Sequence, residues 1–416
     1  MRFGSHTSHP LSNRQHQFIT GLFALQFFTF PVVLGLGNVI TLAILITGIY
    51  FLKLPEVRNV WSSQRMIWLL LALYGIILVG LLYSPAEWAW KSIHLNKYAK
   101  AIYAAVMISL LVAFPQAQRA ALHGFIAAMI FISASTWLNI WFLLPWSASQ
   151  ALGWGQSHHV IGDYITQNVM MSFFCVIALH YSIQSGRVGE KLFWSVIFFA
   201  SAITITHLSI GRTGYVALLA ALAAYIFTAF ESRWKYLALI GMTAIGLLAL
   251  GTSPTLQARF GQAWQELLMS QKNHESSIGH RIYNYKTTTQ MVLDKPFLGH
   301  GTGAYHTEIC KFITPIEKCA NYSWHPHNQY LFIAADHGLI GAMVFIGIIA
   351  YSWWLSLKAK DRQTRVLLAA WTSLLLVNSA INSPLWSARE SHFFFYMLAL
   401  LAAMASTRSA MTSKPA

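Results

Sequence analysis

The chain has 416 residues, of which 56% are hydrophobic and only 10% are charged, and its mean hydropathy is +0.50. Soluble domains carry about 25% charged residues, so this composition excludes a soluble globular protein and predicts an integral membrane protein. The net charge of +15 is explained by basic residues that mark cytoplasmic loops and contact anionic lipid headgroups. We therefore expect membrane lipids, and no nucleic acid, among the partners.

The elements predicted from the sequence are almost all apolar helices. Residues 1–17 are polar and lack the pattern of a cleavable signal peptide. Twelve segments then follow that are long enough, or nearly so, to span a bilayer. They are residues 18–35, 37–54, 66–83, 97–114, 120–144, 166–184, 191–209, 214–230, 235–251, 329–357, 364–382 and 391–407. We predict an all-α, polytopic membrane protein with helices 1–9 in residues 1–251, one long loop in 252–328, and helices 10–12 with a short cytoplasmic tail in 329–416.

The distribution of Lys and Arg predicts the orientation of these helices. Sixteen of the 28 basic residues lie in segments that are cytoplasmic if both termini are inside, and five lie in short outer loops or helix ends. The other seven lie in the long loop, and long loops are translocated largely regardless of their charge. We expect both termini in the cytoplasm and the loop 252–328 outside, which is the periplasm of a Gram-negative cell.

The long outer loop has patterns typical of folded structure, as a loop of this length requires. Ser253 is a candidate N-cap that is followed by proline, and apolar residues then recur at helical spacing. The opposite, polar face carries Arg259 and Glu266, which predicts an amphipathic helix on the membrane or on the helix bundle. A second helix is predicted from Arg281 to about Leu293, before a glycine-rich turn in "FLGHGTGAY".

The three cysteines suggest one disulfide. Cys310 and Cys319 bracket eight residues of the outer loop, where an oxidising compartment favours a bridge between them. Two free thiols are the alternative. Cys175 lies within an apolar segment and is interpreted as a packed core residue.

Three arginines lie at the predicted outer face. Arg212, in "HLSIGRTGY", stands at the joint between two membrane segments, where a guanidinium is costly unless it is paired or faces a water-filled cavity. Contact with lipid phosphate is the alternative for this residue. Arg281, at the start of the second loop helix, is either functional or a solvated surface residue. Arg389 stands beside Glu390, and a simple ion pair explains it.

A polar cluster, "HPHNQYLFIAADHG", stands at residues 325–338, directly before an apolar run. A helix from about Asn328 places His327 at its N-terminus, where the helix dipole and nearby guanidinium groups favour a neutral imidazole. A neutral imidazole can accept a proton, so His327 is a candidate general base. Asn328 is expected to orient the ring or bind a sugar hydroxyl, and Gly338 to relax or interrupt the helix.

Two other interpretations of this cluster remain open. In the first, the histidines only satisfy backbone groups at the membrane interface. In the second, His325 and His327 bind a metal ion together with Glu308, His300 or His306. No regular ligand spacing supports the metal site, and no paired carboxylates stand in the outer loops to hold Mg²⁺.

Three motifs carry a resemblance to a known family. His327, Asn328, Leu331 and Gly338 fit a pattern of His-[Asn/Ser/Gln], two residues, Leu, six residues, Gly. The stretch "IGRTGY" resembles an Arg-x-Gly element at Arg212 and Gly214. The stretch "KPFLGHGTGAY" resembles a Pro-x-x-Gly-x-Gly element at Pro296, Gly299 and Gly301. In this order and on this topology, the motifs resemble the O-antigen ligase family, in which Arg281 occupies the place of the loop arginine.

The resemblance implies a GT-C-like glycosyltransferase of the bacterial inner membrane with a periplasmic active site. It implies a metal-independent, cofactor-free reaction that inverts the donor's anomeric configuration, with O-antigen on undecaprenyl diphosphate as donor and a lipid A–core sugar hydroxyl as acceptor. The catalytic residues would be His327 as base, with Arg212 and Arg281 stabilising the diphosphate, a role that suits the planar guanidinium fork. Substrate binding would involve Asn328, Arg389, His325, Gly214 and Tyr215.

Other activities remain open. An O-antigen polymerase or a protein O-oligosaccharyltransferase would share the fold and the arginines. A polytopic transporter of lipid or polysaccharide is an alternative from another class. The membrane segments are nearly free of charge and the polar residues gather at one outer face, which favours interfacial chemistry over alternating access.

Overall fold

The computed structural model describes residues 12–231, 233–269 and 276–411, and this part of the chain forms helices and loops without a β-strand. The helices, in chain order, are α1 (Asn13–Val32), α2 (Leu34–Phe51), α3 (Pro55–Ser63), α4 (Arg65–Gly80), α5 (Trp88–Tyr98), α6 (Lys100–Ala113), α7 (Pro115–Leu138), α8 (Tyr164–Gln184), α9 (Val188–His207), α10 (Arg212–Ala229), α11 (Arg233–Thr252), α12 (Pro254–Leu268), α13 (Ser277–Asp294), α14 (Tyr305–Glu308), the 3₁₀ turns η1 (Ile309–Phe312) and η2 (Ile316–Lys318), α15 (Cys319–Tyr322), α16 (Gln329–Lys358), α17 (Arg362–Ile381) and α18 (Ala388–Met411).

Each of the twelve predicted apolar segments contains a helix, namely α1, α2, α4, α6, α7, α8, α9, α10, α11, α16, α17 and α18. Within the described residues, eight helices are long and apolar enough to cross a membrane, or nine if the pair α3 and α4, bent by 72°, forms one span. The chain is therefore a polytopic helical membrane protein, and the number of twelve crossings stays a prediction.

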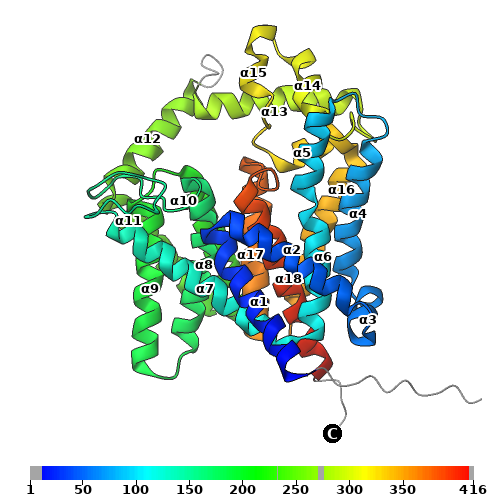
Figure 1. Ribbon diagram of the computed structural model, residues 1–416. Helices are drawn as coiled ribbons and strands as arrows, with labels where there is room; N and C mark the ends of the chain where they lie inside the picture. Colours follow the sequence, from blue (N-terminus) through cyan, green and yellow to red (C-terminus); the bar gives the residue numbers. More distant parts are fainter. Residues whose placement is uncertain (1–11, 232, 270–275, 412–416) are drawn as a thin grey trace, which may run out of the picture.

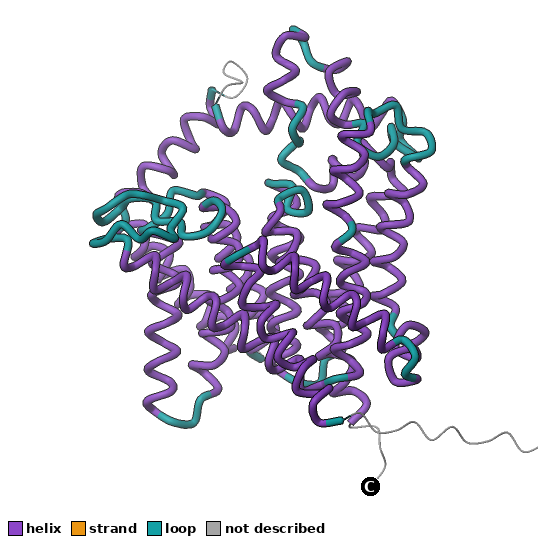
Figure 2. Tube along the Cα trace, viewed as in Figure 1, coloured by secondary structure: helices purple, strands orange, loops and turns teal. Residues whose placement is uncertain are grey.

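The helices are arranged with the loop helices at one end of the bundle. In Figure 1, α12 and α13 run across the top of the view, with α14 and α15 beside them, whereas α1 begins and α18 ends at the bottom. Figure 2 shows the same arrangement, in which long helices connect the two ends of the molecule. The two ends of the described chain thus lie together, opposite the 252–328 loop. Which end faces the periplasm stays a prediction.

The loop helices start at Ser/Thr-type caps. The hydroxyl of Ser253 accepts a hydrogen bond from the N–H of Leu256 (3.1 Å), so α12 begins where the sequence predicts. The second helix begins four residues before the predicted Arg281, because Ser276 caps it by accepting from the N–H of Gly279 (3.1 Å). Arg281 consequently lies in the second turn of α13. Cys310 and Cys319 are joined by a disulfide, with their Cα atoms 5.2 Å apart.

A sharp bend interrupts α16 at Gly338, whose backbone angles are φ 62° and ψ −164°. The glycine-rich turn that precedes α14 packs into this bend. The three shortest backbone hydrogen bonds between the two are Leu339 N–H to Pro296 O (2.8 Å), His300 N–H to Ala335 O (3.0 Å) and Gly301 N–H to Asp336 O (2.7 Å). A Cβ at Gly338 would lie 2.2 Å from the carbonyl oxygen of Phe297, so the bend requires glycine. The predicted interruption of the helix is confirmed.

Candidate active site

A tight turn before α10 places Arg212. The hydroxyl of Ser209 accepts a hydrogen bond from Asn168 Nδ2 (2.8 Å), and its carbonyl accepts one from the hydroxyl of Tyr215 (3.1 Å). Gly214 packs directly on Asn168, where an added Cβ would lie 2.5 Å from Nδ2. Gly214 and Tyr215 thus fix α10 against α8, with Arg212 as the first residue of the helix. Substrate contact by either of them stays a prediction.

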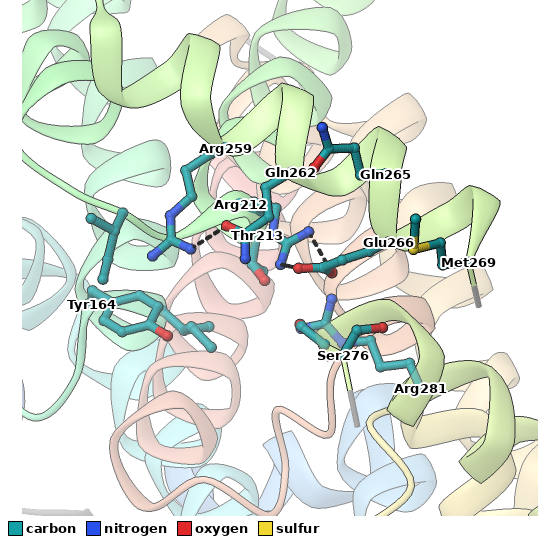
Figure 3. Close-up of a pocket in the computed structure, with 13 residues that line it drawn as sticks. Tyr164, Arg212, Thr213, Arg259, Gln262, Gln265, Glu266, Met269, Ser276 and Arg281 are labelled. Carbon is teal, nitrogen blue, oxygen red and sulfur yellow. Dashed lines mark hydrogen bonds and ion pairs between the residues drawn. The ribbon is translucent and has the colours of Figure 1, made fainter. Parts of the chain in front are cut away.

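The guanidinium of Arg212 is held by a carboxylate from the loop. Glu266 of α12 accepts two parallel hydrogen bonds from it, with Nη1–Oε2 at 3.0 Å and Nη2–Oε1 at 3.1 Å (Figure 3). Both side chains are mostly buried, with exposed fractions of 21% and 10%. The N–H of Ile278, in the first turn of α13, also donates to Glu266 Oε2 (3.2 Å). Glu266 therefore connects α10, α12 and α13.

Arg281 extends from α13 toward the same region. Burial, with a further contribution from the positive charge of Arg212, lowers the pKa of Arg281, but an arginine remains charged at neutral pH. Among the residues described, its guanidinium has no hydrogen-bond or ion-pair partner. A partly buried, unpaired charge is costly, so this guanidinium is available to an anion.

A cavity of about 510 Å³ opens between α8, α10, α12 and α13. Three guanidinium groups line it, those of Arg212, Arg259 and Arg281, and Glu266 is the one carboxylate that the described residues contribute (Figure 3). Thr213 and Ser277 also line the cavity and lie in the first turns of α10 and α13. Helix N-termini carry partial positive charge, so the cavity has the chemistry of an anion site, and in particular of a phosphate site.

His327 lies directly before the N-cap of α16. Its backbone φ is +53°, in the left-handed region that residues other than glycine rarely adopt. Two contacts hold this conformation: the hydroxyl of Tyr285 donates to the carbonyl of His327 (3.0 Å), and the N–H of His327 donates to His325 Nδ1 (3.2 Å). The imidazole Nδ1 of His327 is buried without a partner in the described part of the chain. Backbone strain of this kind clusters at functional sites.

The surroundings of His327 keep its ring uncharged. Burial lowers the pKa of His327 to about 2, with smaller contributions from His325, Arg281 and His280 in the same direction. The imidazole is therefore neutral at pH 7, as the sequence predicts. The contribution from Arg281 also places its guanidinium within electrostatic range of His327. The structure thus brings Arg212 and Arg281 into one cavity and sets His327 near Arg281, but not in contact with Arg212.

Residues 196–346, from α9 to the middle of α16, match the family model described as O-Antigen ligase. This segment of the chain is therefore similar to the O-antigen ligase family. The matched segment contains α10, α12, α13 and His327, which supply most of the cavity and the strained histidine. No curated protein matched the chain. Family members are glycosyltransferase-like enzymes, and the match supports an activity of that type for this chain.

Two further residues of the family pattern have structural partners. The side-chain oxygen of Asn328 caps α16 by accepting from the N–H of Leu331 (3.0 Å). Its amide nitrogen donates to the carbonyl of Ala380 at the end of α17 (3.2 Å). Asn328 therefore positions His327 from the next residue along the chain, and its predicted contact with a sugar hydroxyl stays a prediction.

Arg389 does not line the cavity. Its Nη2 lies 3.4 Å from the carbonyl of Val32, at the end of α1, and its Nη1 approaches Gly162 in the loop before α8. The simple ion pair with Glu390 is not formed in the structure, because adjacent residues of α18 point in different directions. A role for Arg389 in substrate binding stays a prediction that the cavity does not support.

Sequence reasoning missed Arg259 and Glu266 as site residues. Their helical spacing placed both on the polar face of α12, which was the available signal. That face covers the cavity, a placement that the amphipathic pattern alone does not specify. Nothing local to α12 indicates that Arg212, 54 residues earlier in the chain, supplies the partner of Glu266.

Buried polar groups connect the glycine-rich turn to the helix bundle. Asp336 of α16 is buried, and its carboxylate accepts hydrogen bonds from the N–H groups of Tyr305 (2.8 Å) and Gly303 (3.2 Å). His94 Nδ1 lies 3.3 Å from the same carboxylate, and its Nε2 is 3.0 Å from Nε2 of His306. These groups tie the glycine-rich turn to α16 and α5. Glu390 is likewise buried, in the first turn of α18.

The residues suggested for a metal site have other partners. His300 Nε2 is hydrogen-bonded to the carbonyl of Met291 (2.9 Å), and His306 Nδ1 to the carbonyl of Ser323 (2.7 Å). Glu308 pairs with Lys311. Within the described ranges, no group of three or more His, Cys, Asp or Glu residues is placed to hold a metal ion.

Proposed function

We propose that the protein is an O-antigen ligase that transfers O-antigen polysaccharide from undecaprenyl diphosphate to a sugar hydroxyl of lipid A–core. The reaction takes place at the periplasmic face of the inner membrane, with both termini in the cytoplasm. The observation that carries the proposal is the cavity, in which Arg212 and an unpaired Arg281 meet at two helix N-termini, near the uncharged His327.

The cavity stabilises the leaving group. When the acceptor oxygen attacks the anomeric carbon, the bond from that carbon to the phosphate oxygen breaks and the diphosphate takes the electron pair. The fork of Arg281 and the N-termini of α10 and α13 lie where this charge develops. One well-placed donor of this kind contributes about 3–4 kcal/mol to the transition state. A single in-line displacement inverts the anomeric configuration.

His327 accepts the proton that the attacking hydroxyl loses. Its pKa of about 2 makes it a weak base, because burial and the charge of Arg281 oppose protonation. A bound diphosphate adds negative charge beside Arg281, which raises the pKa of the imidazole. His327 is therefore a stronger base when the donor is present, and the proton transfer is coupled to donor binding.

The test is transfer by purified protein in lipid vesicles. The donor is a polysaccharide on undecaprenyl diphosphate, the acceptor is lipid A–core, and EDTA is present. We expect product without added metal or an ion gradient, and a loss of at least about a hundredfold in Arg281→Ala and His327→Ala. Lys286→Ala is the matched control, because Lys286 is exposed on the same helix as Arg281.

Three results would contradict the proposal. Normal lipopolysaccharide ladders from the Arg212→Ala, Arg281→Ala and His327→Ala variants would show that these residues are not required for transfer. A strict requirement for added divalent metal would return attention to His325 and His327 as ligands. Elongation of the lipid-linked polysaccharide with no transfer to lipid A–core would identify a polymerase instead.

A further inference from the structure

Glu266 occupies the position in the cavity where an anionic ligand would be bound. Its two carboxylate oxygens accept from the two terminal nitrogens of Arg212 at 3.0 and 3.1 Å. Two oxygens of a phosphate group bind a guanidinium fork in the same geometry. A donor diphosphate that reached Arg212 would therefore meet a guanidinium whose fork is already filled.

A second donor of the cavity is filled by the same carboxylate. Glu266 Oε2 accepts from the N–H of Ile278, which is one of the N–H groups in the first turn of α13 that have no partner within the helix. Such groups bind phosphate in many proteins. Glu266 thus satisfies, from inside the chain, both kinds of donor that the cavity offers to a ligand.

α12 is fixed at its start and more exposed further along, which allows the side chain of Glu266 to move away from Arg212. The start of the helix is fixed, because the Ser253 hydroxyl donates to the carbonyl of Thr206 (2.8 Å) and Leu256 is buried. Further along, Phe260 and Trp264 are 67% and 61% exposed. Glu266, near the opposite end of the helix from this anchor, connects the later turns of α12 to Arg212 and to the start of α13.

We propose that Glu266 is an internal counter-anion that occupies the diphosphate position and is displaced by the diphosphate of the donor, with a shift of the later turns of α12. This inference rests on the proposed function for the identity of the donor. Glu266 lowers donor affinity, because its pair with Arg212 must break before the donor binds. Arg281 remains unpaired and provides the first attraction for the incoming anion.

The test measures binding of inorganic pyrophosphate to the purified, full-length protein by titration calorimetry at fixed ionic strength. Glu266→Gln removes the competing charge and should tighten pyrophosphate binding by about tenfold or more, the equivalent of one charge-assisted hydrogen bond. Glu317→Gln is the matched control, because Glu317 is exposed in the same loop, and it should leave the affinity unchanged. Unchanged or weaker binding in Glu266→Gln would overturn the proposal.

Two more variants separate displacement from a merely structural role. In the background of Arg212→Gln, the change Glu266→Gln should add less affinity than in the wild type, because the pair with Arg212 is already absent and only the contact with Ile278 remains; an equal gain in both backgrounds would sink the idea. If Glu266→Gln folds poorly, Glu266→Asp replaces it. Its shorter carboxylate reaches Arg212 and Ile278 less well, so pyrophosphate should again bind more tightly than to the wild type, and no tightening would count against displacement.

The two proposals fail in different ways. If pyrophosphate binding tightens in Glu266→Gln but the wild type transfers no polysaccharide to lipid A–core, the ligase function falls and the counter-anion stands. If the wild type transfers polysaccharide and the variant binds pyrophosphate as the wild type does, the counter-anion falls and the ligase function stands.

Discussion

The bend in α16 makes a demanding prediction for Gly338→Ala. The observed angles, φ 62° and ψ −164°, lie in a region that is essentially restricted to glycine, and occupying it costs an alanine about 1–3 kcal/mol. The new Cβ would also stand 2.2 Å from the carbonyl oxygen of Phe297, so the glycine-rich turn must withdraw. Three backbone hydrogen bonds would then weaken, each with a net value of about 1 kcal/mol.

We therefore expect Gly338→Ala to lower the free energy of unfolding by about 3–5 kcal/mol. The measurement is unfolding of the purified protein in mixed micelles with increasing SDS, followed by circular dichroism. Gly347→Ala is the control on the same helix, since its Cβ would meet only Leu69 at an ordinary distance of 3.8 Å. If both variants unfold within about 1 kcal/mol of the wild type, the bend does not depend on glycine, and the reasoning is refuted.

Three further predictions concern the site. Arg281→Lys keeps the charge but loses the planar fork, so kcat/KM for transfer should fall by at least about tenfold, and an unchanged value would argue against bidentate phosphate binding. The pKa of His327 is about 2 in the folded protein and about 6.5 in the unfolded chain. The free energy of unfolding should therefore fall by about 1.4 kcal/mol for each pH unit below pH 6.5. His327→Gln should therefore unfold with less acid sensitivity between pH 6.5 and 4.5, as thermal melts would show. Asn328→Ala should lower the free energy of unfolding by about 1 kcal/mol, because the helix cap is lost, and Asn328→Asp should lower it much less. Equal losses for the two variants in SDS unfolding would contradict the capping role.

The sequence was most informative where a structural signal is local. The apolar segments identify the helices, Ser253 and Asn328 mark two helix starts, and Gly338 marks the bend. Each of these signals depends on residues within a few positions along the chain. The direction of the His327 pKa shift was also predictable, because nearby Arg281 contributes to it, but burial, the largest cause of the lowered pKa, was not.

The partners of the site residues were not predictable in the same way. The contact between Glu266 and Arg212 depends on how α12 lies across the bundle, and no pattern within α12 specifies that direction. The start of α13 was placed too late because Gly279 and His280 are weak helix formers, which obscured the cap at Ser276. Arg389 was grouped with the other arginines from its position near an outer helix end, whereas α18 directs it toward α1 instead.

The docking of the glycine-rich turn into the bend of α16 has a consequence for protein engineering. Residues 296–301 and 335–339 complete each other's backbone hydrogen bonds, so neither stretch is a self-sufficient module. A chimera that imports the 252–328 loop of a homologue without the matching half of α16 would combine two surfaces that did not evolve together. Exchanges intended to alter acceptor choice should therefore have their boundaries before Pro296 and after Leu339, so that both halves of this joint come from the same parent.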